Sequence, residues 1–343
     1  MNDEQPADSV EDHEDSAAHA SEGESSLTVL LALGANLAVG VLKLIAGLIS
    51  GSAALLSESA HSAGDSTTEL LLLVAQRRSR KPADRSHPFG YGKERYFWSL
   101  IAAVAIFVLG AAFSAYEGVE TMLGHGGEGG TLWINYPVIV FAAVLEGISL
   151  RQAAGQMRKE TSRSRRSLVS YVRTPRDPTV NSVLLEDTAA MIGLAIAAAG
   201  VGLHQLTGSP FWDGLASVLI GVLLLSVTLV LARACEGLLI GKQADPRLLR
   251  EIERWLEEQD EVDDVVDVMS MLTGSESILL CTRVDFVDSF SAADLETACA
   301  RIDSELHERF PMLGEVFVQP ASRKDRGLRD RVTERYGRAL AEE

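Results

Sequence analysis

Long apolar blocks recur along the first two thirds of the chain and stop near residue 240. A hydrocarbon core about 30 Å thick requires roughly 20 apolar residues, because a helix rises by 1.5 Å per residue. Blocks of this length predict six membrane-spanning helices, over residues 27–49, 53–75, 96–119, 132–150, 180–203 and 211–239. The pattern therefore predicts an α-helical polytopic membrane domain over residues 27–240.

After residue 241 the pattern changes to that of a small water-soluble domain. Helical spacing in RLLREIERWLEEQ precedes two segments of strand character, a second helical segment and a last strand, GEVFVQP. This order predicts an α+β domain of the αββαβ, ferredoxin-like type over residues 241–322. Residues 323–343 are densely charged and are predicted to form a C-terminal tail, with a short helix in RVTERYGRALAEE as the alternative.

The charge is distributed as unevenly as the apolar residues. The formal net charge is −17, and the first 26 residues contain nine acidic side chains but no Lys or Arg, which predicts a disordered acidic tail over residues 1–26. That tail lacks the basic start of a cleaved signal, so we expect the first apolar block to remain as a signal anchor. The acidic balance argues against nucleic acid as a partner.

Lys and Arg also predict the orientation in the membrane. The loops after the second and fourth blocks are rich in both, whereas ISGS, GHGGEGG and HQLTGSP contain neither. Basic loops remain in the cytoplasm. Six spans then place both termini there, and we expect an integral protein of the bacterial cell (inner) membrane.

The second block is the least apolar, because it contains Glu58, His61, Asp65 and Glu69. An Asp at the centre of a span costs about 2.5–3.5 kcal/mol, so it needs a compensating role. His61 and Asp65 are four residues apart and therefore share one helical face. They offer one nitrogen and one oxygen to a divalent metal, and tetrahedral coordination needs two more ligands. The alternatives are a soluble amphipathic helix and an ordinary ion pair.

Acids in other blocks are candidates for the missing ligands. The fifth block offers Glu186 and Asp187, the fourth offers Glu146, and the sixth offers Asp213 near its outer end. Neighbouring residues point about 100° apart on a helix, so Glu186 and Asp187 cannot both face one metal. One of them could instead carry protons or pair with Lys43, whose own alternative is to extend to the membrane interface.

HSAGD in the second block, SHPFGYGKER in the next loop and an αββαβ domain after six helices occur together. In these features the chain resembles the cation diffusion facilitator family from about residue 26 to 320. With DPTVNSVLLEDTAAMIG, it looks most like the zinc transporter 9 subgroup. The resemblance implies a divalent-metal/proton antiporter, which is a secondary active transporter and not an enzyme. It also implies a homodimer that associates through the cytoplasmic domain.

The resemblance further implies a transport site on the second and fifth helices. His61 and Asp65 match the first ligand pair, and Asp187 matches the last ligand of the second pair. The remaining position is Val183, which cannot bind a metal. Glu186 is the expected substitute, with Glu69 or a water molecule as the lesser possibility.

A second, exposed metal site is implied in the loop after the second helix. Asp84 and His87 match two of its ligands, and Tyr91 stands where some relatives have His. This weaker site adds to the transport site and does not replace it.

The expected transported metal is Zn²⁺, with Mn²⁺, Fe²⁺ or Co²⁺ as alternatives, because one nitrogen among carboxylates makes a harder site. Protons are the expected counter-ion, since metal ligands must lose protons to bind. Two other functions remain open at this stage. One is a membrane metal sensor or scaffold that binds without transport, and the other is a membrane-embedded metal-dependent enzyme, although H-E-x-x-H is absent.

Overall fold

The chain folds into two compact units, each with its own hydrophobic core. The computed structural model describes residues 33–34, 36–124, 132–164, 178–275 and 277–336, without side chains for residues 156–183. The first unit contains residues 33–72, 101–164 and 179–232, and the second contains 73–100 and 233–336. The division lies inside three long helices, so the predicted domain limits at residues 240 and 322 remain a prediction.

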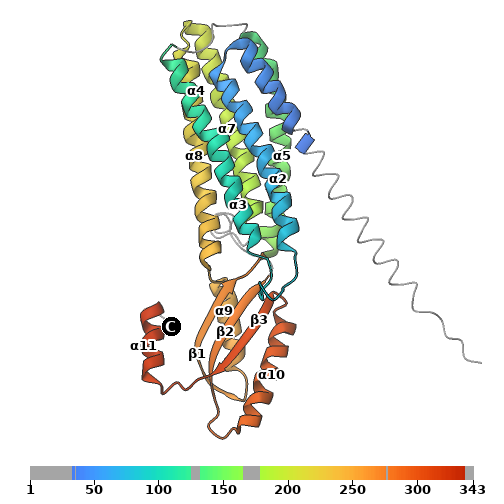
Figure 1. Ribbon diagram of the computed structural model, residues 1–343, viewed down its shortest axis with the longest axis vertical. Helices are drawn as coiled ribbons and strands as arrows, with labels where there is room; N and C mark the ends of the chain where they lie inside the picture. Colours follow the sequence, from blue (N-terminus) through green and yellow to red (C-terminus); the bar gives the residue numbers. More distant parts are fainter. Residues whose placement is uncertain (1–32, 35, 125–131, 165–177, 276, 337–343) are drawn as a thin grey trace, which may run out of the picture. The chain divides into compact units, whose positions relative to one another are not determined.

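Long helices that run alongside one another form the first unit (Figure 1). The first described helix is Asn36–Ser50. It is followed by α2 (Ala53–Ser79), by α3 (Glu94–Ala105) and α4 (Phe113–Met122) joined through a π-helical segment, and by α5 (Asn135–Ser164), α7 (Pro178–Thr207) and α8 (Phe211–Ile240). A three-residue 3₁₀ turn, Leu132–Ile134, precedes α5.

Four of these helices are long and apolar enough to cross a membrane: Glu94–Met122, Leu132–Gly155, Leu184–Thr207 and Phe211–Ile240. They confirm a helical membrane domain. The helix Asn36–Ser50 is shorter within the described residues, and α2 is about 40 Å long but polar. Six spans therefore remain a prediction. The acidic tail, residues 27–32, GGEGG and most of the basic loop after the fourth block lie outside the described residues.

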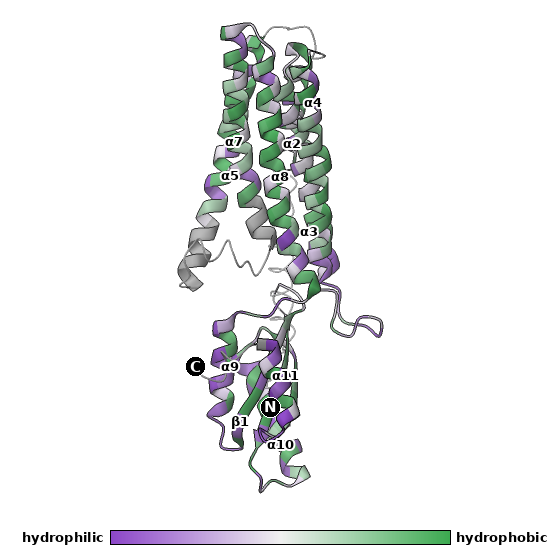
Figure 2. Cartoon of the chain, turned by 90° about the vertical axis from the view of Figure 1, so that its left-hand side faces the viewer, coloured by the Kyte–Doolittle hydropathy of each residue, from purple (hydrophilic) through white to green (hydrophobic). Residues whose placement is uncertain are grey.

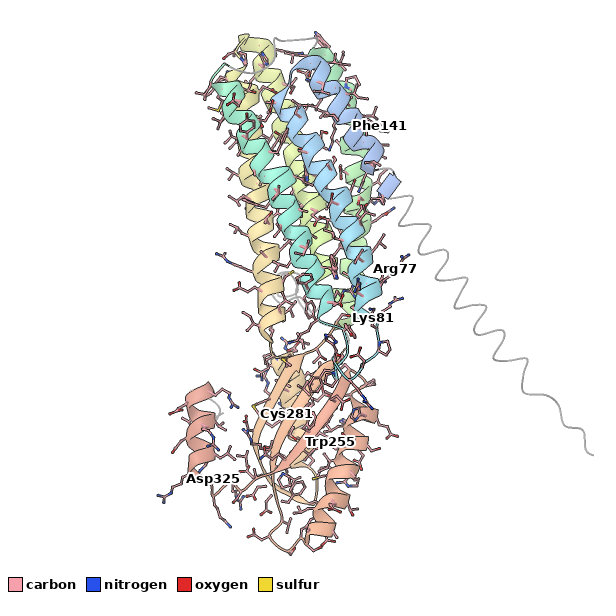
Figure 3. All side chains as sticks on the ribbon, viewed as in Figure 1. Arg77, Lys81, Phe141, Trp255, Cys281 and Asp325 are labelled. Atoms are coloured by element: carbon pink, nitrogen blue, oxygen red, sulfur yellow. The ribbon has the colours of Figure 1, made fainter. Side chains whose placement is uncertain are left out.

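Small residues allow the helices to approach closely. At Gly118 of α4, an added Cβ would lie 2.6 Å from the backbone oxygen of Gly214 on α8, and the reverse distance is 2.7 Å. Small side chains at a helix interface are typical of membrane bundles. Large apolar side chains instead cover the outside, as Phe141 on α5 illustrates (Figure 3).

The second unit contains a three-stranded sheet with the predicted order of elements. These elements are α9 (Pro246–Glu257), β1 (Val262–Leu272), β2 (Ile278–Phe286), α10 (Ala292–Arg309) and β3 (Leu313–Pro320). The strand order is β1-β2-β3, with β1 antiparallel and β3 parallel to β2. An α+β domain of αββαβ order is thus present, while its ferredoxin-like classification remains a prediction.

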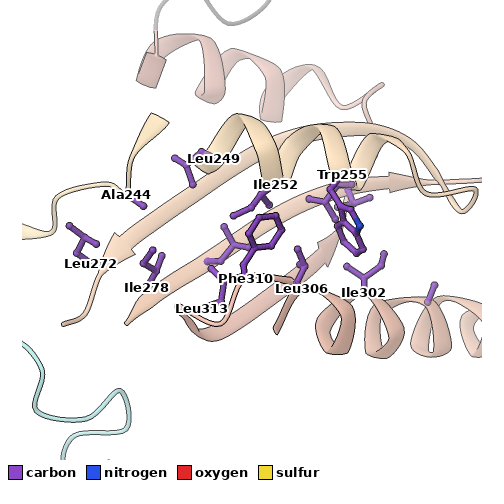
Figure 4. Close-up of a cluster of buried hydrophobic side chains, with 14 of the residues drawn as sticks. Ala244, Leu249, Ile252, Trp255, Leu272, Ile278, Ile302, Leu306, Phe310 and Leu313 are labelled. Carbon is purple, nitrogen blue, oxygen red and sulfur yellow. The ribbon is translucent and has the colours of Figure 1, made fainter. Parts of the chain in front are cut away.

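Alternation along β2 explains how this sheet buries one face. Every second residue of the strand, beginning at Ile278, is buried. Side chains of α9 and α10, including Ile252, Trp255 and Leu306, complete the same core (Figure 4). Each helix begins at a capping side chain, Asp245 before α9 and Ser291 before α10, which satisfies backbone donors at the helix start. Hydrophilic and hydrophobic residues alternate along α9 and α10 (Figure 2).

Part of the predicted C-terminal tail is a helix. Residues Arg326–Tyr336 form α11, and Leu328 on it is buried. Arg335 Nη1 lies 3.0 Å from Asp267 Oδ2 on the sheet face opposite the core. Residues 337–343 lie outside the described part of the chain.

Candidate metal site in the helix bundle

His61 and Asp65 lie together on α2, as the four-residue spacing predicted. The distance from His61 Nδ1 to Asp65 Oδ1 is 3.4 Å, and the two side chains are 2% and 13% exposed. Neither ring nitrogen of His61 has a hydrogen-bond partner, and Asp65 Oδ1 lacks one too. Buried polar atoms without partners are uncommon in folded proteins and indicate an ion or water that completes the site. An imidazole nitrogen and a carboxylate oxygen are both able to coordinate a divalent cation.

Glu186, rather than Asp187, is the acid of α7 that reaches toward this pair. Glu186 is buried, its Oε1 has no partner, and Asp65 is its strongest charged neighbour. Asp187 is less buried, and its Oδ2 accepts a hydrogen bond of 2.8 Å from Ser149 on α5. The 100° between successive helical residues accounts for the difference. The side chain of Val183 lies outside the described residues.

Glu69 extends the ligand-bearing face of α2 by one more turn. Its Oε1 accepts a 2.6 Å hydrogen bond from Asn36 Nδ2, and its Oε2 is buried without a partner. Asp187 and Glu146 are its charged neighbours. Asn36 therefore connects the first described helix to this face of α2.

A buried ion pair lies on the same face of α2, on the other side of His61. Lys43 Nζ is 3.0 Å from Glu58 Oε2, 3.0 Å from Ser62 Oγ and 3.7 Å from Glu146 Oε1. Lys43 is completely buried. It does not extend to the membrane interface, and its partners are Glu58 and Glu146 rather than the acids of α7. Sequence reasoning missed these partners, because the spacing along α2 places Glu58 on the face of His61 but does not show which residue of another helix it meets.

Asp213 does not join the metal site. From the first turn of α8, its carboxylate accepts hydrogen bonds from Ser52 Oγ at 2.8 Å and from the backbone N–H groups of Ala53 and Ala54. The first N–H groups of a helix have no partner within that helix, so Asp213 caps α2 from a neighbouring helix. Sequence reasoning identified Asp213 as an acid inside the bundle but missed this role.

Asp84 and His87 of the weaker predicted site lie close together in the second unit. Their nearest ionic atoms are 3.6 Å apart, and both side chains are half exposed. Both oxygens of Asp84 are already bonded, Oδ1 by the backbone N–H groups of Ser86 and His87 and Oδ2 by the Tyr91 hydroxyl at 2.8 Å. The hydrogen bond from Tyr91 lowers the pKa of Asp84. These contacts describe a hydrogen-bonded turn, and the metal site there remains a prediction.

The ligand set in the bundle is not assembled. Within the described part of the chain, no three His, Cys, Asp or Glu side chains converge closely enough to hold a metal. His61 and Asp65 form a pair on α2, and Glu58, Glu69 and Glu186 each have a buried carboxylate oxygen without a hydrogen-bond partner.

Comparisons with known proteins show what the chain is similar to. Residues 29–239 match the family model of the cation efflux transmembrane domain. The mitochondrial proton-coupled zinc antiporter SLC30A9 of Xenopus laevis is 35% identical over 244 residues, which cover 71% of this chain and 44% of that protein. Metal tolerance protein C4 of Arabidopsis thaliana is 32% identical over 271 residues, covering 76% and 57%.

A bacterial relative matches over more of its own length. The manganese efflux system protein MneP of Bacillus subtilis is 25% identical over 297 residues, which cover 86% of this chain and 95% of that protein. By contrast, the chain spans less than half the length of the SLC30A9 protein it matches.

Proposed function

This chain belongs to the cation diffusion facilitator family and is similar to its zinc transporter 9 members, and from that premise we propose that it exports divalent metal ions from the cytoplasm in exchange for protons. Proteins of this family are integral membrane transporters. That class confirms the expected secondary transporter and excludes the membrane-embedded enzyme.

The observation that carries this proposal is the unpaired, buried imidazole of His61. Both of its nitrogens lack partners beside a carboxylate oxygen that also lacks one, inside a helix bundle. Leaving such groups unsatisfied costs about 1–3 kcal/mol each, and a divalent cation removes that cost when it binds. These unsatisfied groups support a site that binds a divalent cation reversibly.

His61, Asp65 and Glu186 are the proposed ligands, with Asp187 as the alternative acid. Burial and the free Oε1 support Glu186, whereas the hydrogen bond from Ser149 engages Asp187. One imidazole nitrogen with two or more carboxylate oxygens accepts Zn²⁺ and also suits Mn²⁺, Fe²⁺ and Co²⁺. Zinc is the proposed main substrate, supported by the name of the Xenopus laevis relative. The name of the Bacillus subtilis relative supports manganese as the second candidate.

Proton exchange follows from the chemistry of these ligands. Imidazole and carboxylates bind metal only when deprotonated, so metal loading releases protons and proton binding empties the site. Cytoplasmic metal enters, the helices reopen the site to the other side, and protons displace the metal. This cycle needs no source of energy other than the proton gradient.

The remaining features of the proposal concern the whole protein. We place both termini in the cytoplasm, with six spans and a homodimer formed through the cytoplasmic domain. The location is the bacterial cell (inner) membrane, which the Bacillus subtilis relative supports, although the Xenopus laevis relative is mitochondrial by name.

A metal sensor or scaffold that binds without transport is the second candidate. This second function is favoured by one observation, the absence of a third converging ligand among the described residues. Purified protein in liposomes with an imposed pH gradient separates the two functions. We expect uptake of Zn²⁺, and of Mn²⁺, Fe²⁺ or Co²⁺ to a lesser degree, that collapses when the gradient is dissipated. Metal binding without uptake of any of the four would favour the sensor and contradict the antiporter.

A further inference from the structure

A cluster of charged side chains inside the bundle has no role in the proposed transport cycle. The ammonium of Lys43 lies among oxygens from two other helices, those of Glu58 and Ser62 on α2 and that of Glu146 on α5. Lys43 and Glu58 are both completely buried. Glu146 is 11% exposed. The ammonium of Lys43 and the carboxylate of Glu58 are thus at least as buried as the side chain of His61, and Glu146 is slightly more exposed.

This arrangement has the composition of a cation site. Its metal-binding groups would be two carboxylates and a hydroxyl, which are the hard oxygen ligands preferred by Mg²⁺, Ca²⁺ and Mn²⁺. Glu58 also presents a second oxygen, Oε1, which is buried without a hydrogen-bond partner. Gly193 of α7 leaves room for this oxygen, because any Cβ at that position would collide with it. A cation already sits at the centre, and it is the ammonium of Lys43.

The negative charges of Glu58 and Glu146 require a cation between them. Two carboxylates without a cation would be costly in this environment, since removing one partner of a buried ion pair leaves a buried charge without compensation. The cluster also adjoins the transport site, because Glu58 lies one turn from His61 on α2 and Ser62 directly follows His61 in the chain. Without Lys43, a metal ion could therefore bind to Glu58 and Glu146, one helical turn away from the transport site.

We propose that Glu58, Glu146 and Ser62 form a second cation site in the bundle, which the tethered ammonium of Lys43 fills permanently. The ammonium reserves these oxygens, so a divalent ion is limited to the His61 and Asp65 site. Lys43 is in this sense a specificity-determining residue that acts through Glu58 and Glu146. The inference rests on the proposed function for its biological meaning, but the site itself can be tested separately.

The test is the number of Mn²⁺ ions bound per chain by full-length protein in detergent at mildly alkaline pH. Equilibrium dialysis gives the number, and electron paramagnetic resonance of Mn²⁺ distinguishes bound from free ion. Lys43→Met keeps the length of the side chain but removes its charge. We expect Lys43→Met to bind one Mn²⁺ more than wild type. Lys43→Arg, which keeps a cation in place, and the double variant Lys43→Met/Glu58→Gln are expected to match wild type.

The proposal is judged by the difference in bound Mn²⁺ between Lys43→Met and wild type. If wild type binds no metal but Lys43→Met binds one, the transport site fails and the filled second site stands. If Lys43→Met binds the same number as wild type, the second site is overturned whatever wild type binds.

Stability provides a second measurement if Lys43→Met folds poorly. We expect Mn²⁺ to raise its melting temperature more than that of wild type, because the metal replaces the missing ammonium. A variant that melts at the same temperature with and without Mn²⁺, or that stays unfolded in its presence, would also overturn the proposal.

Discussion

At the scale of single residues, the proposed function depends on His61. A histidine in a membrane helix ordinarily bonds through at least one nitrogen, and a neutral ring always has one donor and one acceptor to satisfy. Here both nitrogens are buried and without partners, and the nearest charged atom is Asp65 Oδ1 at 3.4 Å. This geometry supports the proposal that the pair receives a cation, because His61 and Asp65 do not form a structural hydrogen bond with each other.

Glu186 and Asp187 provide a test at the scale of one residue. We expect Glu186→Gln to weaken metal binding more than about tenfold, because it removes a charged ligand oxygen. Asp187→Asn should weaken it less, since that side chain is engaged by Ser149. Isothermal titration with Zn²⁺ on the two isosteric variants makes the comparison. The opposite order of the two effects would assign the ligand to Asp187.

Spacing in the sequence was sufficient to predict the pair His61 and Asp65, because both lie on one helix with a fixed period. It was not sufficient to choose between Glu186 and Asp187, since that choice depends on how α7 is rotated against α2. The sequence also suggested Asp213 as a possible metal ligand, because it does not show which residues of other helices Asp213 meets. Its partners at residues 52–54 are about 160 residues away in the chain, and no local pattern connects them.

At the scale of elements, α2 is held in place at its first turn by a neighbouring helix. The carboxylate of Asp213 accepts from Ser52, Ala53 and Ala54, and its side chain is almost completely buried. One turn farther along, Ser57 and Ser217 share a short hydrogen bond between the same two helices. These contacts fix the position of α2, and therefore of His61.

Loss of this cap should destabilise the bundle. We expect Asp213→Ala to cost about 1–2 kcal/mol, the upper part of the range for a helix cap, because several donors lose their acceptor together. Thermal unfolding in detergent measures the effect as a lower melting temperature. Glu117→Gln, at a half-buried acid on α4, is the matched control and should change little. Equal melting of both variants would mean that Asp213 does not cap α2.

The loop after α2 offers a test of its hydrogen-bonded turn. The hydroxyl of Tyr91 lowers the pKa of the Asp84 carboxyl, so its contribution to the turn is complete above the ordinary value of about 3.9 and is lost as the pH falls through the lowered pKa. We expect Tyr91→Phe to raise the pKa of Asp84 toward that ordinary value. Carbon NMR of labelled Asp84 follows the titration. An unchanged pKa would show that Tyr91 does not bond the carboxylate.

Periodicity predicted the elements of the second unit in their correct order, because alternation and helical spacing are local properties. At the C-terminus it favoured a charged tail and gave a short helix over residues 331–343 only as the alternative, whereas α11 spans Arg326–Tyr336, because so charged a segment gives little apolar signal beyond Leu328. In the bundle, the polar α2 is the element that composition describes least well. Its length is that of a span, and its polar residues are the ones that form the site and the ion pair.

Orientation belongs to the whole molecule. The basic residues at the end of α2, among them Arg77 and Lys81 (Figure 3), predict that this end faces the cytoplasm. Trypsin should therefore remove the C-terminal sheet domain from inside-out vesicles and leave it intact in right-side-out vesicles. Immunoblotting against a C-terminal tag records the result. Digestion in right-side-out vesicles alone would reverse the topology and the direction of transport.

The central claim is that His61 and Asp65 on α2 bind the metal ion that the whole protein transports. Replacing Asp65 tests this claim most directly. The measurement is proton-coupled Zn²⁺ uptake into sealed vesicles that contain wild type or Asp65→Ala at equal protein content. We predict that uptake by Asp65→Ala falls to the level of empty vesicles, while Glu117→Gln retains wild-type uptake. Unchanged proton-coupled transport by Asp65→Ala would contradict the assignment of the site.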